Sequence, residues 1–193
     1  MLVNKESPAF VYSKRMLEHY DTNYGKFEYR FQAPEYPQRI VAIYEHLLEH
    51  GFLEQMLRLD IEDQGLAGIE AVHSKELIAK VMATEEMNES ETAYTIHPDN
   101  YQCKGTFEAC KCAVDASLTL LRYVLEKESC GYAITRPPGH HAHPNLAYGF
   151  CFFNNVAICA KEAINTFGLK KVLIFDWDIH QGDGTQDIFY EDQ

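Results

Sequence analysis

The sequence lacks any hydrophobic run that approaches the roughly 18 residues of a membrane span. Its first six residues, MLVNKE, also lack the basic and apolar regions of a secretory signal peptide. Of the 193 residues, 46% are hydrophobic and 24% are charged, which is typical of a globular chain long enough for one domain with a real core. No internal repeat, low-complexity tract or linker divides the sequence, so we expect residues 1–193 to form a single domain.

Paired cysteines and basic clusters are also missing. The six cysteines, at positions 103, 110, 112, 130, 151 and 159, show no paired CxxC spacing, and several have apolar neighbours. We therefore expect reduced, buried thiols in an intracellular protein. The 17 Lys and Arg residues are outnumbered by 29 Asp and Glu residues, and the net charge of −12 argues against direct nucleic-acid binding. The same charge would suit a cationic substrate or partner, although many cytosolic proteins are as acidic.

The apolar periodicity predicts an α/β fold. Helical spacing occurs over 40–48, over 77–81 after Ser74 as N-cap, over 106–125 and over 156–167, and a further helix begins near 185–190. Residues 1–35 are predicted to be irregular and residues 84–105 to form a long loop. Short buried strands are predicted at 132–135 and 172–178. Strand, helix and strand then form a βαβ unit, whose right-handed crossover makes the two strands parallel.

Acidic residues and a histidine directly follow the apolar run 172–175. In an extended chain, side chains two apart share a face, so Asp176, Asp178 and His180 should point the same way. Carboxylate and imidazole groups at the C-terminal end of a buried strand suit a divalent metal such as zinc, and ligands bind at that end of open α/β sheets. The alternative interpretation is an acidic turn that caps a helix beside a surface histidine.

Two further segments carry candidate functional residues. His140 and His141 follow Arg136-Pro137-Pro138-Gly139, a stiff loop after the first strand, and could form a catalytic pair or be structural. His143, just beyond, is interpreted as a solvated loop residue. The loop 149–155 is rich in phenylalanine and could wall a narrow substrate channel, although core packing is the default role of such rings.

Together, the segments 136–142, 149–155 and 176–184 resemble the zinc-dependent histone deacetylase family, and their sequences are most similar to class II. The three segments follow the family's order and spacing, and the resemblance covers residues 34–193. It implies an arginase/deacetylase-like α/β fold with a mostly parallel sheet and helices on both faces. The chain resembles the N-terminal part of a catalytic domain that is truncated at its C-terminus.

The resemblance also implies site roles, position by position. Matching positions comprise Asp178 and His180 as two of three zinc ligands, His140 and His141 as tandem catalytic histidines, Asp176 and Asp183 as their respective carboxylate partners, and Gly149 and Phe150 as walls of an acyl-lysine tunnel. Asp176 also resembles a contributor to a potassium site. The implied reaction is hydrolysis of acetyl-lysine in histones or other proteins, in the nucleus, the cytoplasm or both, with possible corepressor partners. No Ser or Cys is placed beside a base, so no covalent enzyme intermediate is expected.

Several positions depart from the family pattern. Gln181 stands where the family usually has histidine, and Asp183 is the residue usual outside class II. The family's third zinc ligand and its carbonyl-polarising tyrosine lie farther along the chain than residue 193, so we expect this chain alone to be catalytically incompetent. Two alternatives stay open: a non-catalytic short form that binds partners, and an acetylpolyamine amidohydrolase of the same fold.

Overall fold

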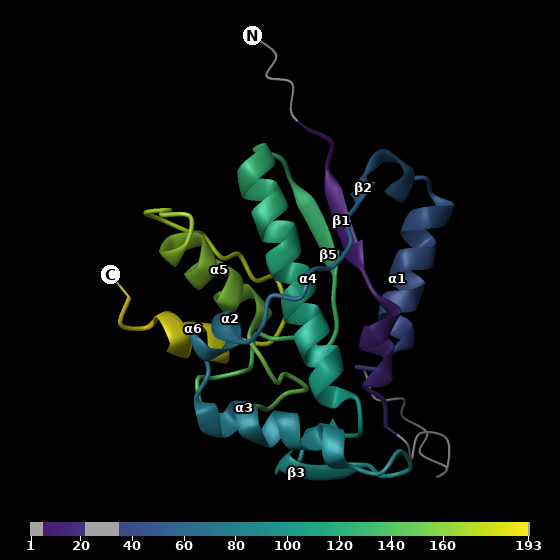
Figure 1. Cartoon of the computed structure of the whole chain (residues 1–193), viewed down its shortest axis with the longest axis vertical. Coiled ribbons are helices and arrows are strands. Elements are labelled where there is room, and N and C mark those ends of the chain that lie inside the picture. The colour runs from purple at the N-terminus through teal and green to yellow at the C-terminus, as the bar shows by residue number, and fades with distance from the viewer. Residues whose placement is uncertain (1–5, 22–34, 193) are drawn as a thin grey trace.

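A three-stranded parallel sheet organises the first half of the fold (Figure 1). The computed structural model describes residues 6–21 and 35–192. The sheet has the order β2-β1-β5, with β1 at Ala9–Tyr12, β2 at Leu57–Arg58 and β5 at Gly131–Ile134. β1 pairs with β5 along its whole length, from Ala9 opposite Gly131 to Tyr12 opposite Ile134. The predicted parallel sheet is therefore confirmed, although its central strand lies in a segment predicted to be irregular.

Strand β1 is central because its four residues, AFVY, are all buried and serve both faces of the sheet. Phe10 and Tyr12 lie against Tyr44 of helix α1 (Gln38–Glu49), with ring centroids 6.5 and 4.4 Å from the tyrosine. The alternate residues face the opposite side, where helix α4 (Thr106–Lys127) crosses the sheet in Figure 1. Helices thus cover both faces of the sheet, as the resemblance implies.

Helix α4 divides the interior into two hydrophobic clusters. On one side, Cys112, Ala116 and Leu120 pack with β1 and α1. On the other side, α4 packs against α3 (Lys75–Met82) and α5 (Asn155–Asn165). A helix with apolar residues on two sides must be buried on both, and this explains why α4 lies between the sheet and the smaller helices. No helix in the described ranges is long and apolar enough to cross a membrane.

The remaining elements are short. They are α2 (Ala67–Glu70), α6 (Asp183–Phe189), the antiparallel pair β3 (Ala93–His97) and β4 (Asn100–Gln102), and 3₁₀ helices at Lys14–Glu18, Leu53–Gln55 and Ala83–Glu86. The interpretation of 84–105 as a loop is therefore wrong over most of its length, since a 3₁₀ turn and a hairpin occupy it. The rest of the segment predicted to be irregular, residues 1–5 and 22–34, lies outside the described residues.

The segment 172–178 is extended but forms no strand with the described residues, so the prediction of a buried parallel strand is wrong there. A hollow of about 390 Å³ lies between the end of β5 and residues 174–178, which explains why no hydrogen-bonded ladder joins the two. The side chains of Leu173, Phe175 and Trp177 are 78–89% exposed. The side chains of Asp176 and Asp178 are less exposed, at 35% and 47%, although Phe175 and Trp177 line the same hollow.

All six cysteines are unpaired, as expected. Cys103, Cys110, Cys112 and Cys151 are buried, and burial raises the pKa of each of these thiols. Cys130 is exposed, so the expectation of burial does not hold for every thiol.

Candidate metal and histidine site

A buried arginine anchors the loop that carries the two histidines. Arg136 follows β5 and is fully buried. Its Nε donates to Glu35 Oε1 at 2.7 Å, and Nη2 donates to the Tyr101 hydroxyl at 2.6 Å. Its Nη1 donates to the carbonyl oxygens of Met16, at 3.0 Å, and of His19. A buried guanidinium is tolerated only when it is paired and hydrogen-bonded in this way, so the start of the loop is fixed to three distant segments.

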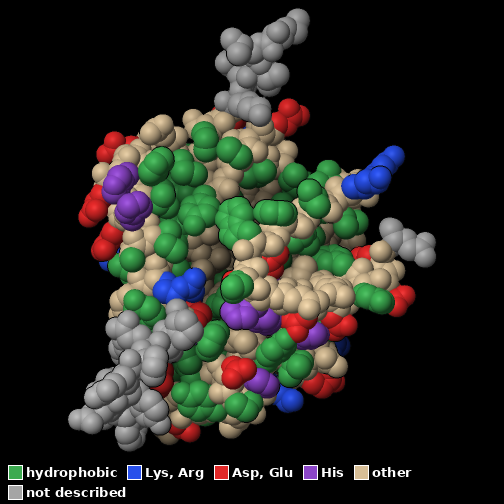
Figure 2. Space-filling view, turned by 180° about the vertical axis from the view of Figure 1, so that it is seen from behind, with side chains coloured by type: hydrophobic (Ala, Val, Ile, Leu, Met, Phe, Trp, Pro, Cys, Tyr) green, Lys and Arg blue, Asp and Glu red, His purple; other side chains and the backbone are tan. Residues whose placement is uncertain are grey.

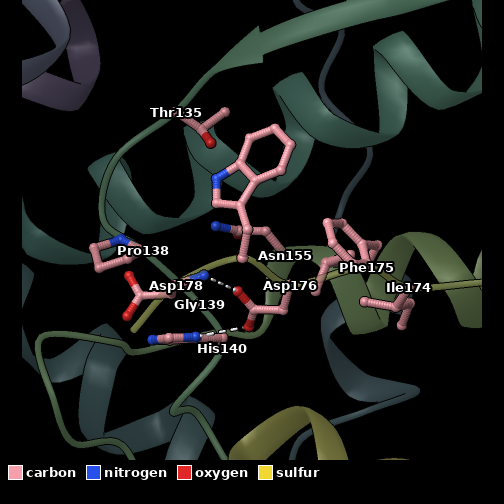
Figure 3. Close-up of a pocket in the computed structure, with 11 residues that line it drawn as sticks. Thr135, Pro138, Gly139, His140, Asn155, Ile174, Phe175, Asp176 and Asp178 are labelled. Atoms are coloured by element: carbon pink, nitrogen blue, oxygen red, sulfur yellow. Dashed lines mark hydrogen bonds and ion pairs between the residues drawn. The ribbon is translucent and has the colours of Figure 1, made fainter. Parts of the chain in front are cut away.

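His140 pairs with Asp176, as the sequence predicts. The ring Nδ1 lies 2.8 Å from Asp176 Oδ2, and the other carboxylate oxygen accepts the backbone N–H of Asp178 at 3.0 Å (Figure 3). Any side chain at Gly182 would place its Cβ 2.6 Å from Asp176 Oδ2, so glycine is required where this turn passes the carboxylate. Asp176 is thus held in place by contacts on both oxygens.

His141 pairs with Asp183, the first residue of α6. Its Nδ1 lies 2.7 Å from Asp183 Oδ1, and the Tyr148 hydroxyl donates to the other carboxylate oxygen. Partial burial acts to raise the pKa of Asp183, but the hydrogen bonds from His141 and Tyr148 outweigh it and hold that pKa at about 2. The rings of His140 and His141 are 4.2 Å apart, so the two pairs lie side by side.

These contacts set the protonation pattern of both imidazoles. An ionised carboxylate only accepts hydrogen bonds, so the Nδ1 of each ring must carry the proton. In the neutral ring, Nε2 is then left as the basic nitrogen. The geometry therefore gives two imidazoles of defined tautomer, each with a carboxylate behind it.

Asp178 and His180, the two zinc ligands that the resemblance implies, lie next to each other in the structure. His180 Nδ1 lies 2.9 Å from Asp178 Oδ1, so the imidazole and the carboxylate are hydrogen-bonded to each other at the pocket. The backbone N–H of His180 lowers the pKa of the Asp178 carboxyl, which favours the anionic form that binds a cation. One imidazole and one carboxylate suit zinc. No group of three or more His, Cys, Asp or Glu side chains is placed to share a metal within residues 6–21 and 35–192.

These groups meet at a pocket of about 250 Å³. It is lined by Glu35, Arg39, Pro138, His140, His141, Gly149, Phe150, Asp178 and His180. Both residues predicted to line a substrate tunnel are among them. The predicted clustering of His140, His141, Asp176, Asp178, His180 and Asp183 is confirmed, because Asp176 and Asp183 contact the two pocket histidines directly.

The backbone at Gly149 and Phe150 has an unusual conformation. Their φ angles are +57° and +66°, in the left-handed region that a residue with a side chain adopts at a cost of about 1–2 kcal/mol. Asn100, which the sequence analysis missed, holds this turn. Its Oδ1 accepts the Phe150 N–H at 2.8 Å, and its Nδ2 donates to the Cys151 carbonyl at 2.8 Å. The turn signal Pro98-Asp99 next to Asn100 could have indicated a hairpin, but not its contact 50 residues away.

The interpretation of His143 as a solvated residue is wrong. Its side chain is 21% exposed, and its Nδ1 lies 2.9 Å from Asp187 Oδ2 on α6. The ring also stacks on Tyr148, with centroids 5.8 Å apart. Sequence reasoning missed Tyr148 and Asp187 because neither lies in a recognised motif, and only the packing of α6 on the loop brings them together.

Comparison with known proteins agrees with this architecture. The profile of the family "Histone deacetylase domain" matches residues 33–193. Histone deacetylase HDA1 of Candida albicans is 35% identical over 211 residues, which cover 95% of this chain and 24% of that protein. Polyamine deacetylase HDAC10 of Mus musculus is 38% identical over 167 residues, with 82% and 24% covered. The solved HDA15 HD domain matches with a TM-score of 0.87 at 33% identity, covering 98% of this chain and 51% of that chain.

Parallel strands flanked by helices, with paired histidines at the strand ends, place this chain among α/β proteins of the arginase/deacetylase-like class. The family profile narrows this class: the chain belongs to the histone deacetylase family. It spans about a quarter of the length of the curated relatives above and about half of the solved domain.

Proposed function

We propose that residues 1–193 form part of a zinc-dependent deacetylase domain that hydrolyses the amide of acetyl-lysine. One observation carries the proposal: two His–Asp pairs, with contacts of 2.8 and 2.7 Å, face the same pocket as Asp178 and His180. Histidines with a purely structural role would not require metal-binding side chains and two oriented imidazoles around one cavity. The arrangement suits hydrolysis of an unactivated amide, which requires a base, an acid and charge stabilisation.

Asp178 and His180 would hold the zinc ion, together with a third ligand from outside the described residues. When bound, zinc supplies a Lewis acid for the acyl carbonyl and lowers the pKa of water towards 7. The potassium ion that the resemblance implies at Asp176 stays a prediction, since both oxygens of that carboxylate already accept hydrogen bonds.

His141 would act as general base and then as general acid. Its Nδ1–H is held by Asp183, so its Nε2 is free to take a proton from the attacking water and to return it to the leaving lysine amine. The low pKa of Asp183 keeps the carboxylate ionised while His141 becomes charged. His140, held by Asp176, would orient the water and add electrostatic support. Gly149 and Phe150 would exclude water along the acyl-lysine chain.

The test is hydrolysis of an acetyl-lysine peptide in the presence of zinc. We expect the chain alone to show no more turnover than its His141→Ala variant. We expect turnover when it is co-expressed with a polypeptide that carries the part of the HDA15 domain it does not cover. In that complex, His141→Ala should lower kcat by roughly 10²–10⁴-fold. A soluble complex that binds zinc yet shows no His141-dependent hydrolysis would refute the proposal.

An acetylated polyamine is the second candidate substrate. Polyamine deacetylases of Mus musculus, Rattus norvegicus and Danio rerio are 37–38% identical to this chain. The net charge of −12 also favours a cationic substrate. The ratio of kcat/KM for acetylspermidine and for an acetyl-lysine peptide, measured with the same complex, decides between the two substrates.

A role in binding other proteins is the third candidate. Leu173, Phe175, Trp177 and Ile179 are 78–95% exposed along one extended segment, and such a group of large apolar side chains marks an interaction surface. Figure 2 shows hydrophobic side chains across much of one face of the molecule, with histidine and acidic side chains nearby. The proposed partners are acetylated histones or other acetylated proteins, and corepressors. The proposed location is the nucleus, the cytoplasm or both.

A further inference from the structure

Helix α6 is fastened to the histidine loop by two parallel His–Asp pairs. His141 contacts Asp183 at 2.7 Å, and His143 contacts Asp187 at 2.9 Å, through Nδ1 in both cases. The two carboxylates are four residues apart and so lie one above the other on the same face of α6. Only the first pair faces the pocket, so the second pair needs another explanation.

Tyr148 lies between the two pairs. Its ring centroid is 5.1 Å from that of His141 and 5.8 Å from that of His143, and its hydroxyl donates to Asp183 Oδ2. This hydrogen bond raises the pKa of Tyr148 to about 12, so the hydroxyl keeps its proton as a donor. The two oxygens of Asp183 therefore have different partners: Oδ1 contacts His141 and accepts the Gly184 N–H at 3.0 Å, and Oδ2 accepts the Tyr148 hydroxyl.

We propose that Tyr148 is a positioning residue for the proposed reaction: it fixes Asp183 so that His141 keeps its proton on Nδ1, while the His143–Asp187 pair holds the Tyr148 ring and α6 in place. The inference rests on the proposed role of His141 as base. It assigns functions to Tyr148, His143 and Asp187, none of which lies in a family motif that the sequence analysis recognised.

The surroundings of Asp183 explain why it needs this support. Its side chain is 34% exposed, so water competes for both oxygens. His143 Nε2 lies 3.7 Å from Oδ2, which is too far for a hydrogen bond, so it does not replace the Tyr148 hydroxyl. Without that hydroxyl, the Gly184 N–H still holds Oδ1, but the carboxylate turns more readily towards solvent and releases Nδ1 of His141. The tautomer with the proton on Nε2, which cannot act as a base at the pocket, would gain population.

The experiment measures the tautomer of each histidine ring in the metal-free full chain by long-range ¹H–¹⁵N correlation spectra. Tyr148→Phe removes only the hydroxyl, and Tyr123→Phe is the matched control, because Tyr123 donates its hydroxyl to the Ser7 carbonyl far from the site. In the unaltered chain, we expect His141 to be protonated on Nδ1. Tyr148→Phe should move the tautomer ratio of His141 by about tenfold towards Nε2–H, whereas Tyr123→Phe should leave it unchanged.

A second variant, Asp187→Ala, releases His143 without touching Asp183. It should move His141 in the same direction but by less, since it acts only through the Tyr148 ring. The proposal is overturned if Tyr148→Phe leaves His141 as it is in the Tyr123 control, or if Asp187→Ala has the larger effect. If the Tyr148→Phe variant does not fold, the unaltered chain alone still tests the proposal. A His141 ring that carries its proton on Nε2 in that chain overturns the proposal. These spectra need neither zinc nor substrate, so their outcome is separate from any failure to detect hydrolysis.

Discussion

His73 should make the stability of this protein fall as the pH drops from neutral to about 4. The residue is 4% exposed and joins two parts of the site. Its Nδ1–H donates to the His143 carbonyl at 2.9 Å, and its Nε2 accepts the backbone N–H of Asn154 at 2.9 Å. Asn154 is the N-cap of α5. The imidazole must be neutral to make both contacts, because a protonated ring has no acceptor.

The size of the effect follows from the pKa of His73. Burial lowers it from 6.5 to about 4, although the hydrogen bond to His143 acts in the opposite direction. Because the folded-state pKa is depressed, the unfolded chain takes up the proton first. The stabilisation is complete above pH 6.5 and is lost as the pH falls towards 4. A difference of about 2.5 pKa units at 1.36 kcal/mol each gives about 3 kcal/mol in the free energy of unfolding.

The assay is urea unfolding at pH 7.5 and 4.5, followed by circular dichroism. The His73→Asn variant cannot titrate in this range, so its deficit relative to the unaltered chain should shrink by about 2–3 kcal/mol at the lower pH. Thr84→Val is the control, because it removes buried hydrogen bonds of a group that does not ionise. Its deficit should be the same at both pH values. A His73→Asn deficit that is equally independent of pH would show that the reasoning is wrong.

Three other substitutions test the anchoring of the site. Arg136→Met should destabilise the fold by about 3–5 kcal/mol in urea, because it leaves the buried Glu35 carboxylate with only the longer contact to Arg39 at 3.5 Å and removes the hydrogen bonds of the guanidinium; a loss below about 1 kcal/mol would contradict this. Trp177→Ser should change the free energy of unfolding by less than about 0.5 kcal/mol in urea, since Trp177 is 88% exposed; a loss above about 1 kcal/mol would contradict this. Gly149→Ala should cost about 1–2 kcal/mol and shift the His141 ring resonances, because its Cβ would lie 2.5 Å from His141 Cδ2; unchanged resonances would argue against this packing.

Local patterns were sufficient for most of the helices, whereas the pairing of site residues came from the family resemblance. The spacing of Asp176, Asp178 and His180 after an apolar run gave their shared direction, and the resemblance gave His140 and His141 their carboxylate partners. Both contacts are present at hydrogen-bond distance. Asp176 and Asp178 are less exposed than Phe175 and Trp177, as alternation along an extended backbone favours, even though 172–178 pairs with no described strand.

Pairing between distant segments was not predictable in the same way. β1 has four residues, and nothing local shows that it meets β2 and β5, which lie roughly 50 and 120 residues further along. The hairpin β3–β4 was missed because its strands have only five and three residues. A strand of this length acquires its hydrogen bonds only from neighbours that the fold brings to it.

The sequence by itself determined which chemical groups this protein carries and in what order: two histidines after a stiff loop, and carboxylates and a histidine after an apolar run. Those are matters of local spacing, which covalent geometry enforces. Only the tertiary structure decided that Arg136 is buried against Glu35, that Asn100 holds the turn at Phe150, and that His143 joins Asp187 instead of water. Each of these contacts joins residues at least 44 positions apart, and their energies depend on burial, which no local pattern specifies.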